Sequence, residues 1–581
     1  MKKNRILISI LFVCLLILLT SCSDNSSSST SSTSATKTST DAMTVDYDDD
    51  DYYFDWQSQD YTTINLDDGS STITKSGIYE ITGTLDDGSL IVYVDKSADD
   101  GTIYLVLNGA SISSSNSAPI YIYDAQKVVI ILENGTQNTI YQGSSVKTDD
   151  SGNPSAAIFS KADLTITGGG TLMVTSEFND CITSKDNFKM TDGTLNINAA
   201  GDGIVGKDLL AIKDGNITIT AGKDGMRSTN DTDDNTGNVV IEGGTFNITA
   251  DGDGIQAYDL LQIDGGTYNI TTGGGYTSSN TNTGNFGGKQ QETTASANDT
   301  VSMKALKGSQ SLIINDGTFI ISSANDAMHF NGDITITGGS LTIQANDDAI
   351  HSDTDIKVTG GTINIKNCNE GIEAANVTVD SGSIDITSSD DGFNINDSSG
   401  LLTINDGEIY INAGGDGLDS NNSVKITGGT VHVDGPTDNG NGAIDYNSTF
   451  EITGGTLIAA GSSGMAEVAE SGSQSSLLMY FSSEQAAGTT ITLKDNNGNV
   501  IVTYTPTKQY ASVAISSPKL AAGSTYTLYT GNTKVVTFEL TDNVTYLNES
   551  GVTTKQSIGG GGNISGSGGG SMGGGPGGSG R

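Results

Sequence analysis

One turn signal recurs through the middle of this 581-residue chain and limits the folds that the chain can adopt. It is a glycine that nearly always follows Gly or Asp and often precedes Thr, and most intervals between its copies are 21 to 23 residues. A β-propeller blade needs about 40 residues or more, so this period favours a solenoid of stacked coils over a propeller. The signal glycines are Gly170, Gly193, Gly215, Gly244, Gly266, Gly317, Gly339, Gly361, Gly382, Gly407, Gly429 and Gly455.

A second signal, an acidic residue followed by a small and an apolar one, accompanies nearly every copy of the first. Its acids are Asp202, Asp224, Asp253, Asp326, Asp348, Glu370, Asp391 and Asp416. Between the signals apolar and polar residues alternate, as in TFNIT (245–249), which is typical of strands with one buried face. We therefore predict an all-β fold, a right-handed parallel β-helix with about 22 residues and three short strands per coil.

The repeat divides the chain into regions. We assign residues 61–473 to the β-helix, whose first coils are less regular than the rest. In residues 474–550 the repeat stops but strand-like segments continue, which predicts a small β-sandwich or cap. The Gly-rich residues 551–581 are expected to be a disordered tail.

The first residues are typical of an exported protein. A basic start and an apolar run over 6–19, too short to span a membrane comfortably, predict a signal peptide over 1–21. The tetrapeptide LTSC (19–22) resembles a bacterial lipobox, which predicts a lipidated Cys22. The Ser/Thr- and Asp-rich residues 22–60 would then be a tether. We expect the protein on the extracellular face of a bacterial cell membrane, where the lipid anchor is its only membrane attachment.

The formal net charge of −42 excludes nucleic acid and anionic lipid surfaces as direct partners. Part of this charge falls in one column, because equivalent turn acids of successive coils would stack about 5 Å apart. Asp-Gly is also a good turn pair, so a structural role explains many of these acids. Stacked carboxylates repel by about 1 kcal/mol even in water, however, and oxygen ligands favour Ca²⁺. The predicted calcium ligands are Asp326, Asp347, Asp348, Glu370, Asp390, Asp391 and Asp416.

Three positions past each turn acid stands a residue that the alternation points outward. From Arg227 onward these positions are all polar, which suits an extended glycan, although an exposed strand face is polar by default. The positions from Thr183 on contain no Trp or Tyr, and the only Trp is Trp56, so we do not expect sugar stacking on the solenoid. The predicted polysaccharide-binding residues are Arg227, Gln256, Lys307, His329, His351, Glu373, Asn394 and Asp419.

Two lysines interrupt the acidic column just after an insertion that precedes residue 304. In KALKG, Lys304 takes the place of the turn acid and Lys307 the outward position. If the protein is a polysaccharide lyase, one of these lysines would be the base that removes a proton from a calcium-bound uronate. A lysine beside carboxylates is more often an ion-pair partner, so we lean towards a protein that is not an enzyme.

Several segments resemble a bacterial family of secreted carbohydrate-binding β-helix proteins known for calcium-dependent binding of cellulose and polygalacturonate. The segments are DDAIHSDTDIKVTGGTINI (347–365), EGIEAANVTVDSGSI (370–384) and SSDDGFNIN (388–396), among others between about 61 and 470. The family is similar in architecture to the pectate-lyase-like polysaccharide lyases. Cys181, Ala162 and Gly442 depart from its pattern.

The residues and the resemblance together predict a monomeric surface lipoprotein that binds a polysaccharide, acidic and pectin-like or cellulose, through Ca²⁺ on its β-helix. A calcium bridge would reconcile the charge of −42 with an anionic sugar chain. Two alternatives remain: a polyuronate lyase and a purely structural surface adhesin.

Overall fold

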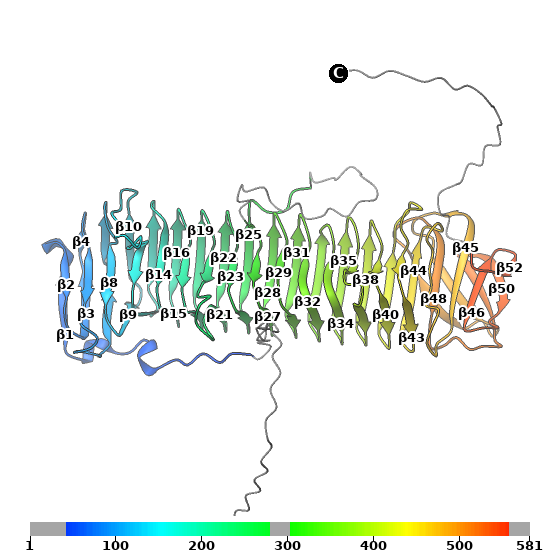
Figure 1. Cartoon of the computed structure of the whole chain (residues 1–581), viewed down its shortest axis with the longest axis horizontal. Helices are drawn as coiled ribbons and strands as arrows, with labels where there is room; N and C mark the ends of the chain where they lie inside the picture. Colours follow the sequence, from blue (N-terminus) through cyan, green and yellow to red (C-terminus); the bar gives the residue numbers. More distant parts are fainter. Residues whose placement is uncertain (1–41, 279–301, 557–581) are drawn as a thin grey trace, which may run out of the picture. The chain divides into compact units, whose positions relative to one another are not determined.

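The computed structural model describes residues 42–278 and 302–556, which form a long stack of β-coils followed by further strands (Figure 1). These residues contain 52 strands and three short 3-10 helices, and no α-helix. Each regular coil contributes three strands, and each strand pairs in parallel with its equivalent in the next coil. The predicted parallel β-helix is confirmed. The signal peptide, Cys22 and most of the Gly-rich tail lie outside the described residues.

The first stack of strands follows the glycine turn. It comprises β4 (Thr84–Leu85), β7 (Ser111–Ser114), β10 (Gln137–Gln142), β13 (Thr171–Ser176), β16 (Thr194–Ala199), β19 (Asn216–Ala221), β22 (Thr245–Ala250), β25 (Thr267–Thr272), β28 (Thr318–Ser323), β31 (Ser340–Ala345), β33 (Thr362–Asn367), β35 (Ser383–Ser388), β38 (Glu408–Ala413), β41 (Thr430–Asp434) and β44 (Thr456–Gly461).

The second stack follows the acidic turn and carries the predicted outward residues. It comprises β2 (Ser71–Ile73), β5 (Leu90–Tyr93), β8 (Ile120–Asp124), β11 (Ala156–Ser160), β14 (Asp180–Ser184), β17 (Ile204–Gly206), β20 (Met226–Ser228), β23 (Ile255–Ala257), β26 (Leu306–Gly308), β29 (Met328–Phe330), the first parts of β32 (Ile350–Val358) and β34 (Ile372–Val379), β36 (Phe393–Ile395), β39 (Leu418–Ser420) and β42 (Ile444–Tyr446).

The third stack closes each coil. It comprises β1 (Tyr61–Asn65), β3 (Gly77–Thr82), β6 (Ile103–Leu107), β9 (Lys127–Leu132), β12 (Asp163–Thr167), β15 (Asn187–Met190), β18 (Leu209–Ile212), β21 (Asn238–Ile241), β24 (Leu260–Ile263), β27 (Ser311–Ile314), β30 (Ile334–Ile336), the second parts of β32 and β34, β37 (Leu401–Ile404), β40 (Ser423–Ile426) and β43 (Thr449–Ile452).

Alternation places one side of every strand in a shared interior. In β19, Ile217 and Ile219 are buried while Asn216 and Thr218 are exposed, as a period of two requires. Identical positions stack from coil to coil, so the core consists of ladders of aliphatic side chains. One ladder is aromatic: the rings of Phe246, Tyr268 and Phe319 stack with centroids 4.7 and 4.5 Å apart.

The small residue of the acidic turn has a packing reason. A Cβ on Gly203 would lie 2.4 Å from the carbonyl oxygen of Gly225, its equivalent in the next coil, and one on Gly225 would lie 2.5 Å from that of Gly254. Consecutive turns thus approach too closely for a large side chain. This close spacing holds the acids beside these glycines in one continuous column.

Residues 42–60, which the sequence assigns to a tether, pack on the outside of the solenoid and form the 3-10 helices η1 (Asp49–Asp51) and η2 (Trp56–Ser58). Trp56 packs on Val106, Val129 and Ile131. Asp51 is fully buried between the ammonium groups of Lys127 and Lys189, at 2.8 and 3.0 Å. This part of the segment belongs to the fold. A third 3-10 helix, η3 (Leu66–Asp68), follows β1.

The last coil is followed by two small sheets. One continues β44 with β48 (Tyr510–Ser516), β45 (Ser476–Gln485), β51 (Val544–Asn548) and β52 (Gly551–Thr553), and the β44–β48 pairing is antiparallel. The other is antiparallel, in the order β47 (Val500–Tyr504), β46 (Ile491–Asp495), β49 (Thr525–Thr530) and β50 (Thr533–Glu539). A second hydrophobic core lies between them. We call these strands the cap.

Candidate functional site

The turn acids use their two carboxylate oxygens for different purposes. Oδ1 of each of seven acids accepts a hydrogen bond from the backbone N–H of the equivalent residue in the next coil, at 2.5 to 3.3 Å. The column is therefore a hydrogen-bonded ladder between turns, and the structural interpretation accounts for one oxygen of each acid. The acids of the ladder are Asp180, Asp202, Asp224, Asp253, Asp326, Asp391 and Asp416.

The eight predicted glycan-contacting residues form one continuous stack. The register pairs each of them with the next across neighbouring strands, and every one is partly exposed. We call this stack, continued to Asp445, the polar strip. It lies beside the ladder, and Oδ2 of Asp202, Asp224, Asp253 and Asp326 contacts side chains of the strip. The strip runs through Arg227, Gln256, Lys307, His329, His351, Glu373, Asn394, Asp419 and Asp445.

In its first part the strip neutralises the ladder. The guanidinium of Arg227 contacts Oδ2 of Asp202 at 2.9 Å and Oδ2 of Asp224 at 3.3 Å. Lys307 Nζ lies 2.9 Å from Oδ2 of Asp253. Each of these ladder acids therefore already has a cationic partner, and a metal ion is not needed there to balance the charge.

The two lysines proposed as a lyase base are both engaged in ion pairs. Besides the Lys307–Asp253 pair, Lys304 Nζ lies 2.5 Å from Oδ2 of Asp326 and 2.7 Å from Oδ1 of Asn325. A general base must direct a free lone pair at its substrate, whereas both ammonium groups already contact carboxylates. This geometry favours the ion-pair interpretation of both lysines.

Histidines contact the acids of the next coils. His329 Nδ1 lies 2.8 Å from Oδ2 of Asp326, and His351 Nδ1 lies 3.2 Å from Oδ2 of Asp348 and 3.1 Å from Oε2 of Glu373. Burial raises the pKa of Asp326, but His329 and Lys304 outweigh it and hold this pKa at about 2. Asp326 thus remains a carboxylate.

Three of the predicted calcium ligands gather near these histidines and differ in environment. One oxygen each of Asp326, Asp347 and Asp348 lies within 4.8 Å of the others. Asp347 is exposed, whereas Asp348 is buried. Because Asp326 and Asp348 already contact basic side chains, this group is compensated in part, and it is a weaker candidate for a metal ion than the sequence suggests.

Glu370 lies in the following coil and is partly exposed. Burial and the charges of Asp348 and Glu373 raise the pKa of its carboxyl to about 9. Its Oε2 accepts a hydrogen bond of 2.6 Å from Asn394, another residue of the strip. A bound cation would let Glu370 ionise.

The last part of the strip lacks cationic partners. We call Asp390, Asp391, Asp416, Asp419 and Asp445 the acidic end. Among the ion pairs of the described residues, none reaches a member of this group. One oxygen each of Asp416, Asp419 and Asp445 lies within 4.8 Å of the others. The acidic end is therefore the strongest candidate metal centre of the strip.

The protonation equilibria of the acidic end reflect its uncompensated charge. Burial first, and neighbouring carboxylates second, raise the pKa of Asp391 to about 8 and that of Asp419 to about 6. For Asp416, burial and the charges of Asp445 and Asp419 outweigh the hydrogen bond from Gly442 and raise the pKa to about 7. A divalent cation would remove this strain, because it favours the charged form of each carboxyl.

The structure extends the strip with aromatic residues that sequence reasoning missed. The register continues from Thr183 to Phe159 and Tyr121 in earlier coils. Beside them stand Tyr93 and Tyr123, which are 52% and 46% exposed, with ring centroids 5.4 Å apart. The expectation that the solenoid offers no ring for a sugar to stack on is therefore wrong. We call Tyr93, Tyr121 and Tyr123 the tyrosine patch.

The patch has a cationic neighbour. Lys161 Nζ lies 4.2 Å from the centre of the Tyr123 ring, and the rings of Tyr121 and Tyr123 approach edge to face at 5.7 Å. Phe159 packs under Tyr121 and is fully buried, so only the tyrosines are accessible. The alternating pattern IYIYD (120–124) was the available signal, because Tyr121 and Tyr123 alternate with the buried Ile120 and Ile122.

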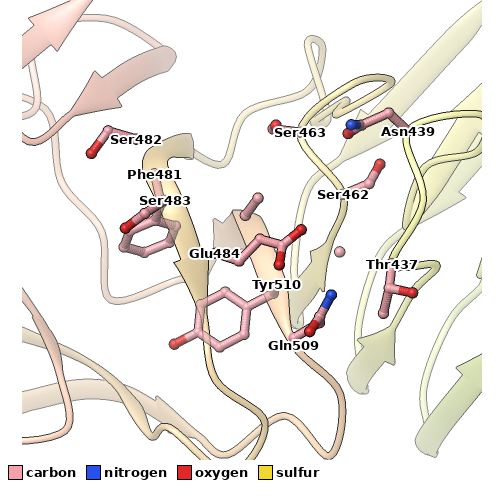
Figure 2. A pocket seen from close by; sticks show the side chains of 12 residues that line it. Thr437, Asn439, Ser462, Ser463, Phe481, Ser482, Ser483, Glu484, Gln509 and Tyr510 are labelled. Carbon is pink, nitrogen blue, oxygen red and sulfur yellow. The ribbon is translucent and has the colours of Figure 1, made fainter.

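A hollow of about 270 Å³ lies where the last coils meet the cap (Figure 2). Its lining includes Thr437, Asn439, Ser462, Glu484 and Gln509, which are hydroxyl, amide and carboxylate groups that sugars can hydrogen-bond. Its two aromatic residues, Phe481 and Tyr510, are only 7% and 2% exposed, so neither presents a ring face. The hollow is a weaker glycan candidate than the strip.

Comparisons with known proteins agree with these features. A family model described as "Carbohydrate-binding domain-containing protein" matches residues 67–349 and 339–537. A protein of Acetivibrio thermocellus with the same description is 37% identical over 129 residues, which are 22% of this chain and 44% of that protein. The match thus spans less than half the length of that relative.

A solved structure of a polysaccharide lyase-like protein from C. thermocellum, a gadolinium derivative, is similar at 34% identity and a TM-score of 0.35. The match covers 37% of this chain and 91% of that chain. The described residues contain no helix long and apolar enough to cross a membrane. Because the family model matches most of the sequence, this chain belongs to the family of carbohydrate-binding domain-containing proteins.

Proposed function

We propose that the polar strip binds an acidic polysaccharide through Ca²⁺ held at its acidic end, on a protein anchored by Cys22 to the outer face of a bacterial membrane. One observation carries the proposal: in a carbohydrate-binding protein, the oxygens of Asp416, Asp419 and Asp445 lie within 4.8 Å of one another where the polar strip ends, and no ion pair of the described residues reaches these three acids. The remainder of the strip balances its acids with Arg227, Lys307 and the histidines.

The donor set fits calcium. Every side-chain donor of the acidic end is a carboxylate oxygen, and Ca²⁺ binds six to eight oxygens at about 2.3–2.6 Å. Three carboxylates would leave coordination positions open, which a uronate carboxylate can fill. The ion would supply the positive charge that holds an anionic sugar chain to a protein of formal charge −42. The neighbouring strip would offer hydrogen bonds to sugar hydroxyls.

The first experiment measures binding of polygalacturonate by isothermal titration calorimetry, with calcium and with EDTA. We expect binding only with calcium. An Asp416→Asn/Asp419→Asn double variant should weaken binding at least about tenfold, because it removes two formal charges from the ion. Asp406→Asn is the matched control, since Asp406 is an exposed acid on the opposite turn of the same coil. Binding that persists in EDTA would refute the calcium bridge.

A neutral chain such as cellulose is the second candidate ligand, and the tyrosine patch is the observation that favours it. Flat, exposed rings offer apolar surface to the faces of sugar rings while their hydroxyls remain hydrated. Such binding would not require calcium. Retention of a neutral glycan in EDTA would assign it to the patch.

The alternatives are separated by their own readouts. A lyase would release unsaturated product that absorbs in the ultraviolet, and Lys307→Ala would abolish the release. A purely structural adhesin would melt at a higher temperature with calcium and bind no glycan. The proposed anchor is tested in cells, because Cys22→Ala should move the protein from the membrane fraction to the medium.

A further inference from the structure

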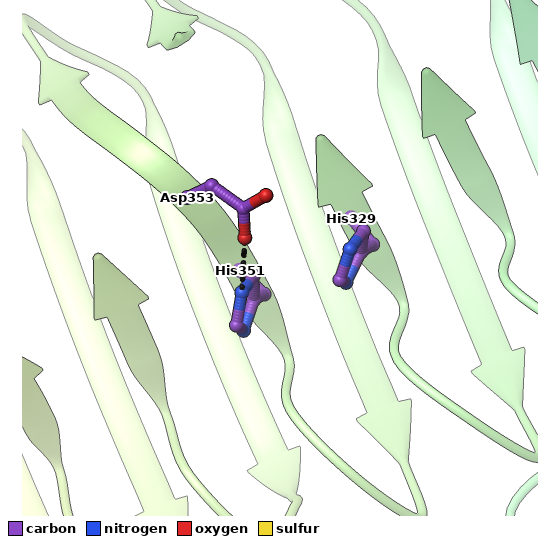
Figure 3. A group of neighbouring side chains, drawn as sticks. All are labelled: His329, His351 and Asp353. Atoms are coloured by element: carbon purple, nitrogen blue, oxygen red, sulfur yellow. Dashed lines mark hydrogen bonds and ion pairs between the residues drawn. The ribbon is translucent and has the colours of Figure 1, made fainter. Parts of the chain in front are cut away.

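Two of the three histidines of the chain stand on neighbouring coils of the strip with their rings in parallel (Figure 3). His329 comes from β29 and His351 from β32, and the register pairs them directly. Their ring centroids are 4.5 Å apart and the rings are inclined by 9°. Asp353, two residues past His351 on the same strand, points towards the ring of His351, and its Oδ1 lies 3.3 Å from Nε2.

Both imidazoles are oriented through the same nitrogen. Nδ1 of His329 is bonded to Asp326, and Nδ1 of His351 to Asp348 and Glu373. If Nδ1 of each ring donates to its carboxylate, Nε2 is the nitrogen left for a metal ion, which would take the place of a proton there. A carboxylate behind each histidine is the arrangement that fixes the tautomer and raises the basicity of histidine ligands in metal sites.

Asp353 is also held in place from behind. Its Oδ2 accepts a hydrogen bond of 2.7 Å from the side-chain amide of Asn331, and its side chain is 49% exposed. The side chains of His329 and His351 are 21% and 16% exposed, so solvent reaches this group. One ligand atom each of His329, His351 and Asp353 lies within 4.8 Å of the others.

We propose that His329, His351 and Asp353 form a binding site for a first-row transition metal ion, with Zn²⁺ as its reference occupant. Two imidazoles and one carboxylate suit Zn²⁺, which binds nitrogen at about 2.0–2.1 Å, and not Ca²⁺, which takes oxygen ligands. Small side-chain rotations close the remaining distance. Three protein ligands leave a coordination position open towards solvent.

This site is separate from the acidic end in both chemistry and position. The acidic end has only oxygen donors and begins two coils later at Asp390, whereas the histidine site has two nitrogen donors. The carboxylates of Asp348 and Glu373 behind the imidazoles attract a dication more strongly than a single proton. The proposal does not depend on calcium-mediated glycan binding.

The test is a calorimetric titration of the full chain with Zn²⁺ at neutral pH. Excess Ca²⁺ is present throughout, so that the oxygen sites are already filled. We expect one zinc ion per chain. Loss of a residue that only supports a metal ligand lowers metal affinity by ~10–100-fold, so Asn331→Ala should lower zinc affinity by about tenfold. His329→Ala and His351→Ala each remove a ligand and should lower zinc affinity by more than ~100-fold. His432→Ala is the control, because His432 is the third histidine and stands on another stack.

A spectroscopic readout keeps the result independent of folding. Co²⁺ in place of Zn²⁺ should give visible absorption bands of a four-coordinate nitrogen-containing site, lost in His351→Ala and retained in His432→Ala. Asp353→Asn changes an exposed residue, so it should leave the fold intact and lower the affinity for Zn²⁺. Absence of zinc binding to the wild type, or zinc binding unchanged in all three ligand variants, would overturn the proposal.

Discussion

At the scale of single residues, the acids of the column use their two carboxylate oxygens differently. Oδ1 ties one turn to the next, and Oδ2 remains for a lysine, an arginine, a histidine or an ion. In Asp202 both roles are visible, since Oδ1 accepts from the amide of Asp224 and Oδ2 contacts Arg227. The loss of stability on substitution therefore depends on whether the new side chain keeps the oxygen that accepts the backbone hydrogen bond.

Replacing Asp202 by Ala should destabilise the protein by about 2–3 kcal/mol, because it leaves the amide of Asp224 without its acceptor and removes one of the two carboxylates that contact Arg227. Asp202→Asn retains an oxygen for the amide and should cost about half as much. The midpoint of guanidinium unfolding measures both, with Asp231→Asn, an exposed acid in a loop, as control. Equal midpoints for the two Asp202 variants would contradict the ladder.

The sequence was sufficient to find the acids but not to rank them. Asp416 and Asp419 were recognisable from the two columns, yet the spacing does not reveal that no base reaches them. Asp445, the last of the outward positions in the sequence, completes their cluster, although Gly442 replaces the turn acid of its coil. Compensation by Lys307 or His351 depends on side-chain reach across coils, which a linear pattern does not encode.

At the scale of elements, the strands of the second stack form a surface with two unlike ends. The tyrosine patch lies on β5 and β8, and the acidic end spans β36 to β42 with the turns before them. Parallel stacking keeps equivalent outward positions in line between these ends. A glycan chain lying along the strip would meet apolar rings at one end and carboxylates at the other.

We expect Tyr93→Ala/Tyr123→Ala to weaken binding of a neutral β-glucan about tenfold or more, because stacking on exposed rings contributes on the order of 1–2 kcal/mol. Binding of polygalacturonate with calcium should change less. Affinity electrophoresis in gels with each polymer compares the two. Tyr52→Ala is the control, since Tyr52 is an exposed tyrosine in the segment before β1. An unchanged mobility of the double variant in the β-glucan gel would exclude the patch.

The junction between the β-helix and the cap provides a pH-dependent contact. His432 on β41 stacks on Tyr504 of β47 with centroids 4.5 Å apart, and the hydroxyl of Tyr504 donates to Asp434 at 2.7 Å. Burial lowers the pKa of His432, although Asp434 and Glu408 oppose this. The folded state therefore binds the imidazole proton less well than the unfolded chain does.

It follows that the contribution of His432 to stability is complete above its unfolded pKa of about 6.5 and is lost as the pH falls below that value. His432→Phe keeps the ring contact and cannot be protonated. Thermal melting of both proteins between pH 7.5 and 5.5 isolates this group, because all other titrations are common to them. As the pH falls, the melting temperature of the variant should rise relative to that of the wild type. If the two melting temperatures change with pH in parallel, His432 is not the group responsible.

Element boundaries show where sequence patterns succeed and fail. The period of the turns predicted the strands of each coil, because turn glycines such as Gly215, with φ of 135°, require that residue. The continuous strands β32 and β34 have no turn between their two halves and were not foreseen. Docking of Trp56 was also missed, although the nearly all-apolar run KVVIIL (127–132) indicates burial on both faces.

At the scale of the whole molecule, charge couples to stability through the acidic end. Burial of carboxylates without counter-charges opposes folding, and an ion that binds only the folded chain reverses this effect. At a calcium concentration 100 times its dissociation constant, binding would add about 2.7 kcal/mol to the free energy of unfolding. Much of the net charge of −42 lies elsewhere and keeps separate molecules apart.

Thermal melting at pH 7.5 should therefore show a higher melting temperature in calcium than in EDTA. The Asp416→Asn/Asp419→Asn variant should melt higher than the wild type in EDTA, because it lacks the repulsion, and should gain less from calcium. Magnesium at the same concentration is the ionic-strength control. A calcium effect of equal size in wild type and variant would locate the ion elsewhere.

The two ends of the β-helix are finished differently, and this limits how molecules can associate. At the last coil β48 runs antiparallel to β44, so another solenoid cannot continue the parallel stack there. Within the described residues, β1, β2 and β4 of the first coil each pair on one side only. Two molecules meeting at their first coils would pair edge to edge in opposite directions. Such an assembly closes as a symmetric dimer, and at the other end the antiparallel β48 opposes growth from β44.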